Sequence, residues 1–78
     1  MNKIKLIWEY KGPNANGIAE HQVIHLTEYC LKNKIEKVST GIEKFQNNTW
    51  FAYLILLEDR HAEVAKELKP RFLQKLQD

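Results

Sequence analysis

The stretch TWFAYLILL, residues Thr49–Leu57, decides the fold of this chain. A strand with one face in water alternates apolar and polar side chains. Every residue from Trp50 to Leu57 is apolar, so we predict a central strand that is covered on both faces. Two helices are enough to cover one face of a small sheet, and a chain of 78 residues has little else to offer. We therefore expect a second copy of the chain to cover the other face.

The composition predicts a single cytoplasmic domain. The chain has one cysteine, Cys30, which excludes an internal disulfide and favours a reducing compartment. No signal peptide is recognisable, and no apolar run approaches the ~20 residues that span a bilayer. The net charge is only +2, with basic and acidic residues mixed along the sequence, which favours neither a membrane nor a nucleic acid as partner.

The remaining segments predict two more strands and two helices. Apolar and polar residues alternate in residues 3–11 and less regularly in residues 37–46, which is typical of strands. The period is helical from residue 18 to 34, and again from residue 58, where acidic residues suit a helix start. We expect the second helix to continue past Pro70, with a kink or a restart at that residue. Its expected apolar stripe consists of Ala65, Leu68, Phe72 and Leu76.

The order of the elements is the ferredoxin-like pattern without its last strand. We predict an α+β two-layer sandwich, β-α-β-β-α, as a single domain over residues 1–78. Its three-stranded sheet has the order 1-3-2, with the first two strands parallel and the third antiparallel between them. Both helices lie on one face, and the outer edge of the first strand stays unpaired. This truncated ferredoxin-like layout places the all-apolar strand at the centre.

The turn at Asn47-Asn48 sets the expected register of the hairpin. A two-residue turn places Phe45 opposite Trp50, so that residues 51, 53, 55 and 57 lie beneath the helices and the even-numbered residues lie on the helix-free face. An apolar centre with a polar rim is typical of an interaction surface. We therefore predict a homodimer through this face. Its expected interface residues are Ile7, Phe45, Trp50, Ala52, Leu54 and Leu56.

His21, His25 and Glu28 form the sharpest constellation of metal-ligand side chains. Their spacing places them on one stripe of the first helix, facing away from its apolar side. Two imidazoles four residues apart bind zinc, copper or nickel, and a carboxylate adds an oxygen ligand. A firm site needs a third ligand, for which His61 is the candidate. The alternative is a solvated helix face on which Glu28 and Lys32 form an ion pair.

No catalytic set is evident in the sequence. Cys30 lies on the predicted buried stripe of the first helix, where it acts as a small core residue. That stripe consists of Ala19, Val23, Leu26 and Cys30. Ser39 is the only serine, and Asp59 and Asp78 are the only aspartates, so no Ser-His-Asp arrangement is suggested. The loop of residues 12–17 matches no phosphate-binding fingerprint and is interpreted as a turn that caps a helix.

Residues 51–54, FAYL, resemble the middle of the RNP1 motif of RNA-recognition-motif domains. The resemblance covers four residues, because residues 49–50 are Thr-Trp instead of a basic residue and glycine, and Leu56 replaces the final aromatic. It implies that Phe51 and Tyr53 stack on RNA bases. The predicted register places both rings beneath the helices, and the fourth strand is missing, so core aromatics are favoured over RNA binding.

These observations favour a homodimeric ligand-binding or regulatory module over an enzyme. No cofactor is evident, apart from the divalent metal that the two helix histidines suggest. The alternative is a small enzyme that uses His21, His25 or His61 in a cavity of the dimer. RNA binding ranks third.

Overall fold

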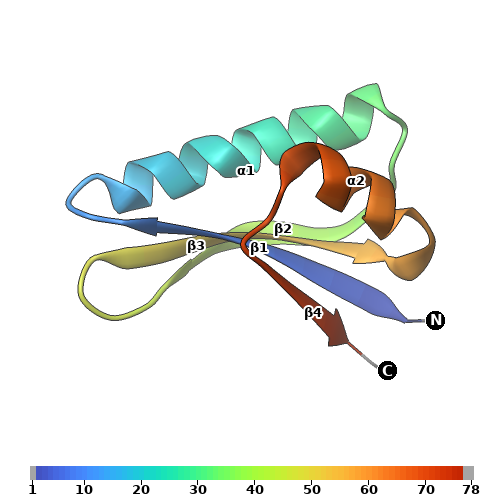
Figure 1. The fold of residues 1–78 in the computed structure, drawn as a ribbon. Coiled ribbons are helices and arrows are strands. Elements are labelled where there is room, and N and C mark those ends of the chain that lie inside the picture. Colours follow the sequence, from blue (N-terminus) through green and yellow to red (C-terminus); the bar gives the residue numbers. More distant parts are fainter. Residues whose placement is uncertain (1, 77–78) are drawn as a thin grey trace.

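A computed structural model describes residues 2–76 of the chain. Four strands form one sheet, and both α-helices lie on one side of it (Figure 1). The elements are β1 (Lys3–Lys11), α1 (Ala15–Lys32), β2 (Lys37–Lys44), β3 (Thr49–Leu57), the 3-10 turn η1 (Glu58–Arg60), α2 (His61–Leu68) and β4 (Phe72–Leu76). The sheet has the order β2-β3-β1-β4, with each neighbouring pair antiparallel. The predicted α+β architecture, with β3 between β1 and β2, is confirmed.

The hydrophobic core lies between the helices and one face of the sheet, which we call the covered face. Leu6 of β1 is opposite Leu54 of β3, and both side chains are fully buried. The predicted apolar stripe of α1 contacts this face, and Val64 of α2 completes the layer. The core cluster consists of Ile4, Leu6, Trp8, Ala19, Leu26, Cys30, Ile35, Ala52, Leu54, Leu56 and Val64.

The sheet has a fourth strand, where the spacing of apolar residues predicted a continuation of the second helix. Helix α2 ends at Leu68, because Lys69 adopts a left-handed conformation (φ 49°) and Pro70 has no N–H to continue the helix. The Arg71 N–H then donates a hydrogen bond to the Ile7 carbonyl (2.8 Å), and β4 pairs with β1. The predicted three-stranded sheet with a free β1 edge was therefore wrong. Residues 72–76 fill that edge as a strand.

The register of the β2–β3 hairpin differs by one residue from the expected one. Lys44, not Phe45, is opposite Trp50, because the connection is longer than a two-residue turn, and both Asn47 and Asn48 have positive φ (55° and 58°). A shift of one residue moves every side chain of a strand to the other face. Residues Thr40 and Ile42 of β2 therefore share the covered face with the even-numbered residues of β3.

This register corrects the expected assignment of β3. Ala52, Leu54 and Leu56, predicted for the dimer interface, are 0% exposed in the core of the single chain. Trp50 is half-buried on the same face and packs against that core. The physical reason is the pairing with β1, which places all four residues opposite the apolar side of that strand.

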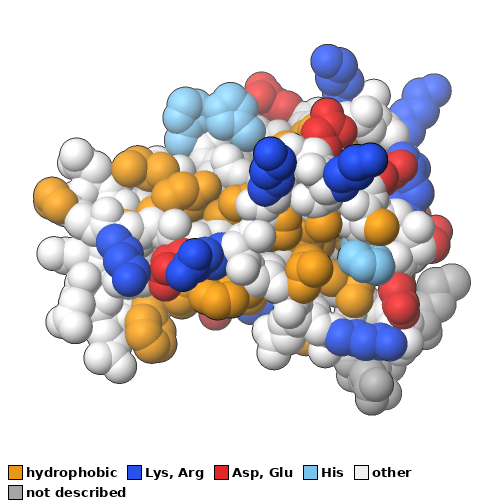
Figure 2. All heavy atoms as spheres, in the orientation of Figure 1, with side chains coloured by type: hydrophobic (Ala, Val, Ile, Leu, Met, Phe, Trp, Pro, Cys, Tyr) orange, Lys and Arg blue, Asp and Glu red, His pale blue; other side chains and the backbone are white. Residues whose placement is uncertain are grey.

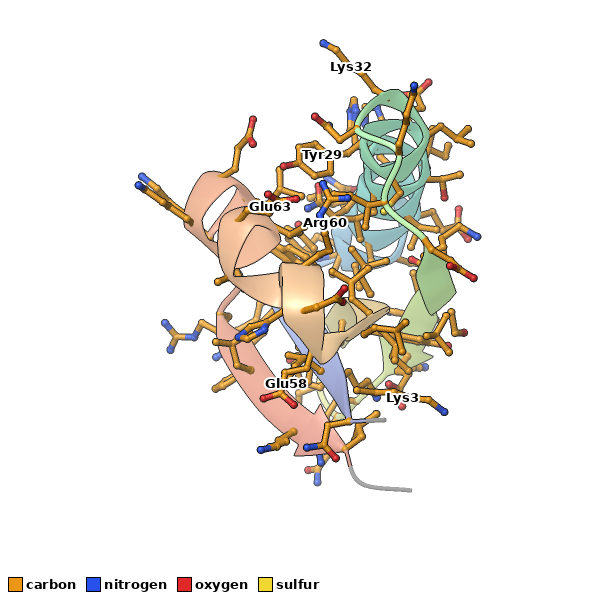
Figure 3. All side chains as sticks on the ribbon, turned by 90° about the vertical axis from the view of Figure 1, so that its right-hand side faces the viewer. Lys3, Tyr29, Lys32, Glu58, Arg60 and Glu63 are labelled. Atoms are coloured by element: carbon orange, nitrogen blue, oxygen red, sulfur yellow. The ribbon has the colours of Figure 1, made fainter. Side chains whose placement is uncertain are left out.

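Side-chain bonds join the two helices above the core (Figure 3). The Tyr29 hydroxyl of α1 donates to a carboxylate oxygen of Glu67 in α2 (2.6 Å). At the end of α1, Arg60 donates to the carbonyl oxygens of Asn33 and Lys34 and forms an ion pair with Glu63. These contacts tie α2 to α1 and hold both on the covered face.

Candidate functional site

The other face of the sheet carries no helix among the described residues, and we call it the open face (Figure 1). Alternation along the strands places the odd-numbered residues of β1 and β3 there. Its apolar side chains are Ile7, Phe51, Tyr53, Ile55, Leu57, Phe72 and Leu76. Most of them are half-buried by their neighbours, and Phe72 at the edge is 46% exposed. The side of β3 that was predicted to lie under the helices is thus the side that lacks them.

Tyr53 lies at the centre of the open face, across the backbone of β2. A Cβ atom built on Gly41, the residue directly opposite, would lie only 2.8 Å from the Tyr53 hydroxyl oxygen and 3.1 Å from Cζ. The absence of a side chain at Gly41 therefore lets the hydroxyl end of the ring approach that strand closely. The Lys5 ammonium nitrogen is 4.7 Å from the centroid of the ring, a cation–π contact.

Two ion pairs lie on the open face. Lys5 Nζ is 2.7 Å from Glu43 Oε1, so the lysine reaches from β1 across Tyr53 to β2. Glu9, two positions beyond Ile7 on β1, lies 3.8 Å from Arg71 Nε. The pairing leaves this face with an apolar centre and with charges of both signs among its polar residues.

Two residues of the predicted interface do lie on this side of the sheet. Ile7 is in the same row as Tyr53 on the open face. Phe45, 56% exposed, packs against Phe51 with the ring centroids 5.7 Å apart. The expected register left out the other apolar residues of the open face. The alternation of β1 is the signal that could have found them, because its apolar side pairs with the even-numbered residues of β3 and so marks these as core.

The predicted metal ligands lie on the solvent side of α1, where Figure 2 shows histidine side chains at the surface. The rings of His21 and His25 are side by side, with centroids 4.4 Å apart, and His25 Nδ1 is 3.8 Å from Glu28 Oε1. His61 instead places Nδ1 2.6 Å from the Glu58 carbonyl oxygen. Within residues 2–76, no three or more His, Cys, Asp or Glu side chains are grouped so that they would hold a metal. The structure therefore does not supply the third ligand that the helix pair requires.

Cys30 is a core residue, as its place on the apolar stripe predicted. It is a free thiol, buried under the helix, and burial raises the pKa of this thiol. A raised pKa disfavours the thiolate, which is the nucleophilic form. Cys30 therefore contributes packing and not reactivity.

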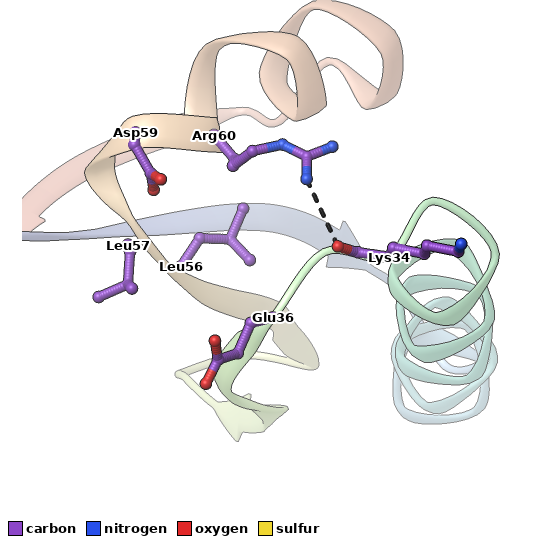
Figure 4. Close-up of a pocket in the computed structure, with 6 residues that line it drawn as sticks. All are labelled: Lys34, Glu36, Leu56, Leu57, Asp59 and Arg60. Atoms are coloured by element: carbon purple, nitrogen blue, oxygen red, sulfur yellow. Dashed lines mark hydrogen bonds between the residues drawn. The ribbon is translucent and has the colours of Figure 1, made fainter.

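A small hollow of about 200 Å³ lies at the opposite end of the molecule from the β2–β3 turn (Figure 1), and Figure 4 shows its lining residues. It is lined by Lys34, Glu36, Leu56, Leu57, Asp59 and Arg60. The Lys34 side chain points away from it, and the Arg60 guanidinium bonds to the Lys34 carbonyl (3.4 Å). The Arg60 guanidinium is thus bonded to the residues that follow α1. The lining residues of the hollow include two carboxylates, Glu36 and Asp59, and no histidine.

Comparison with protein-family models, with curated proteins and with solved structures gave no match for this chain. Neither helix within residues 2–76 has the length and apolar character that a membrane crossing requires. The open face is a feature of the described residues that the fold itself does not explain, and it is the candidate site.

Proposed function

We propose that this chain is a binding module that works as a homodimer through its open face. The observation that carries the proposal is the apolar row of β3, in which Phe51, Tyr53, Ile55 and Leu57 lie on a face that no helix of residues 2–76 covers. Apolar surface of this extent, surrounded by polar residues, is typical of a protein–protein contact. The role expected for such a dimer is ligand binding or regulation.

The size of the face supports a second copy as the occupant. The strands have nine, nine, eight and five residues, and each strand residue occupies roughly 16 Å² of the plane of a sheet. The sheet therefore covers roughly 500 Å² in projection, and the relief of its side chains brings the accessible area towards the ~800 Å² that each partner of a stable complex contributes. A second copy offers a surface of the same size, as a two-fold contact requires.

The charges of the face also support self-association. Lys5 is balanced by Glu43 in the same chain, and Glu9 has Arg71 beside it. These pairs leave the centre of the face near neutral, and Lys3 and Lys11, on the same side of β1, lie at the two ends of that strand. A neutral centre does not repel its own copy, whereas a strongly charged one does.

We further propose that the architecture is ferredoxin-like. Two β-α-β units support it: β1-α1-β2 encloses β3 between its strands, and β3-α2-β4 encloses β1. Small sheets of this layout serve as binding modules, an analogy of fold only. A cytoplasmic location is proposed with it, on the ground that Cys30, the only cysteine, is a free thiol.

Single-stranded RNA is the competing occupant, because Phe51 and Tyr53 lie on the open face as the RNP1 resemblance implies. Two observations favour a second copy over RNA. Lys5 Nζ lies over the Tyr53 ring, 4.7 Å from its centroid, so a base would have to displace this cation–π contact in order to stack there. Glu9 and Glu43, both opposite Phe51, repel phosphates at the other ring.

The mass of the protein in solution tests the proposal. Sedimentation equilibrium of the wild-type chain at micromolar concentrations should give a dimer, and Ile55→Asp should weaken it by roughly 100-fold, since a charge would be buried without a partner. Ile24→Asp is the matched control, because Ile24 is an exposed apolar residue on α1 and should leave the dimer intact.

Two results would overturn the proposal. One is a monomeric wild-type mass at high micromolar concentration. The other is a monomer that binds a labelled single-stranded RNA oligonucleotide at low salt, with binding lost in Ile55→Asp, which would assign the face to RNA.

A further inference from the structure

We propose that the outer edge of β2, together with the flank of α1 above it, binds an extended peptide as an added strand. The peptide has aliphatic side chains at alternate positions, which enter an apolar groove between α1 and β2. This site lies on a different surface from the open face. The inference therefore goes beyond the proposed homodimer and does not depend on it.

Strand β2 is an edge of the sheet, with a neighbouring strand on one side of it only. At the end of the hairpin, the Phe45 N–H donates to the Thr49 carbonyl (2.8 Å). In an antiparallel pair, hydrogen-bonded and non-hydrogen-bonded residues alternate, and the latter direct their N–H and C=O groups away from the partner strand. Counted back from Phe45, the outward groups belong to Lys44, Ile42 and Thr40. No other strand in the described part of the chain pairs with them.

An apolar groove of about 380 Å³ lies beside this edge, where α1 runs above the β2 side of the sheet (Figure 3). Its lining residues are Glu20, Val23, Ile24, Gly41 and Ile42. Ile24 is 56% exposed, and Val23 and Ile42 are half-buried. Binding clefts commonly have volumes of ~300–1,000 Å³. The groove is therefore large enough to take aliphatic side chains from a partner.

The free edge and the groove fit one kind of occupant. A strand that pairs with β2 directs every second side chain to the covered face, with roughly 7 Å between them. There these side chains meet Val23 and Ile24 of α1. In strand addition, main-chain hydrogen bonds supply affinity, and pockets for alternate side chains supply specificity. Glu20 and Lys44 carry opposite charges, so the aliphatic pattern, and not net charge, selects the peptide.

The available edge suits a short peptide. The pairing of β2 with β3 is irregular between Lys37 and Ser39, where one extra residue lies in β2. A bulge of this kind interrupts regular pairing at an edge. At its other end β2 stops at Lys44. The regular edge thus covers residues 39–44.

A second copy of β2 fits the groove less well than such a peptide. Of the residues that a copy directs to the covered face, Thr40 and Lys44 are polar, and Ile42 is apolar. An alternately aliphatic peptide has an apolar side chain at each of these positions. It therefore buries more apolar surface against α1 for the same main-chain hydrogen bonds.

Selection from a displayed library of random heptapeptides, with the wild-type chain as bait, tests the proposal. Peptides with aliphatic residues at alternate positions should be enriched. Ile24→Asp places a carboxylate in the groove and should weaken a selected peptide by roughly tenfold or more in fluorescence polarisation. Leu73→Asp is the matched control, because Leu73 is also 56% exposed but lies on β4, and it should bind the peptide as the wild type does.

Methylation of the peptide backbone tests strand addition itself. Alternate N–H groups of an added strand point towards β2, and the others point away from it. N-methylation of one alternate set should therefore abolish binding, whereas methylation of single residues in the other set should be tolerated. In the complex, amide hydrogen exchange at Thr40 and Ile42 should slow, because their N–H groups become hydrogen-bonded.

Three results would overturn the proposal. They are a library in which the wild type enriches no alternately aliphatic peptide over Ile24→Asp, equal losses from methylation of either set, and exchange at Ile42 that the selected peptide leaves unchanged. A wild-type dimer that Ile24→Asp converts to a monomer would also overturn it and assign the edge to a second copy. A wild-type chain that is monomeric but binds the peptide overturns the homodimer alone.

The variant Ile55→Asp separates the two sites from the other direction. It lies on the open face and should weaken the dimer while the selected peptide binds with unchanged affinity. Loss of peptide binding in a folded Ile55→Asp chain, checked by circular dichroism, would place the peptide on the open face and contradict the groove.

Discussion

The two faces of the sheet are formed by the same strands and carry side chains of similar apolar character. On the covered face, Ala52, Leu54 and Leu56 are fully buried against α1 and α2. On the open face, Tyr53 and Ile55 alternate with them along β3 and are only half-buried, in a sheet that has no helix on that side within residues 2–76. The difference shows that the apolar residues of a strand indicate how many of its faces are removed from water. They do not indicate which of these faces the helices of the same chain cover.

The largest expected effect is a test of this difference within one strand. Leu54→Ala should lower the free energy of unfolding by about 2–5 kcal/mol, because it leaves a cavity in a closed core. Ile55→Ala, the neighbour on the open face, should cost less than about 1.5 kcal/mol in the monomer, since part of its surface already meets water. Urea unfolding under conditions that keep the protein monomeric measures both. Equal losses would contradict the assignment of the two faces.

The next largest effect concerns the close approach of the Tyr53 ring to Gly41 on the open face. Gly41→Ala places a Cβ atom against the Tyr53 ring, which must move, and should cost about 1–2 kcal/mol of stability. In a Tyr53→Ala background the same change should cost only a few tenths of a kcal/mol. A double-mutant cycle by chemical unfolding measures the coupling. If Gly41→Ala costs the same in both backgrounds, the ring does not lie over Gly41.

The smallest expected effect concerns the hydrogen bond between Tyr29 and Glu67, which joins the two helices on the covered face. The hydrogen bond to Glu67 raises the pKa of Tyr29 to about 12 from its usual 10.0. A raised pKa in the folded state means that the bond stabilises the fold below pH 10 and that this contribution is lost as pH rises towards about 12. Because the group is exposed, we expect only a few tenths of a kcal/mol.

Tyr29→Phe should therefore remove part of the alkaline loss of stability. In the wild type, the phenolate absorbance of Tyr29 should appear late, and burial raises the pKa of Tyr10 as well, so the assignment to Tyr29 comes from the difference between the wild type and Tyr29→Phe. Tyr53→Phe is the matched control, since no carboxylate among the described residues accepts a hydrogen bond from its hydroxyl as Glu67 does from Tyr29. An unchanged alkaline profile in Tyr29→Phe would contradict the contribution of the bond.

The sequence predicted much of the fold from local patterns. Alternation in β1 and the period of α1 located both elements, and the Ala19, Leu26 and Cys30 stripe faces the core as expected. The fourth strand was missed because Leu68, Phe72 and Leu76 have a spacing of four, which suits a helix as well as it suits a short strand after a break. Here the conformation of Lys69 and the free edge of β1 decided between the two.

The sequence predicted that one face of the sheet is apolar and free of helices, but it did not predict most of the residues on that face. A helix-free apolar face was expected, and Ile7 and Phe45 were placed on the correct side. The residues of β3 were exchanged because the hairpin connection is longer than the expected turn and shifts the pairing by one residue. The helix pair His21 and His25 was located correctly on the solvent side, but spacing along one helix carries no information about a third ligand from elsewhere in the fold.

The amino-acid order by itself determined the central strand and its apolar sides, because the alternation of side chains is a local property of an extended backbone. Only the tertiary structure decided which of those sides faces the helices. That choice depends on pairing between β1 and β3, which lie far apart in the sequence, and on the length of one turn, where a single residue exchanges core and surface.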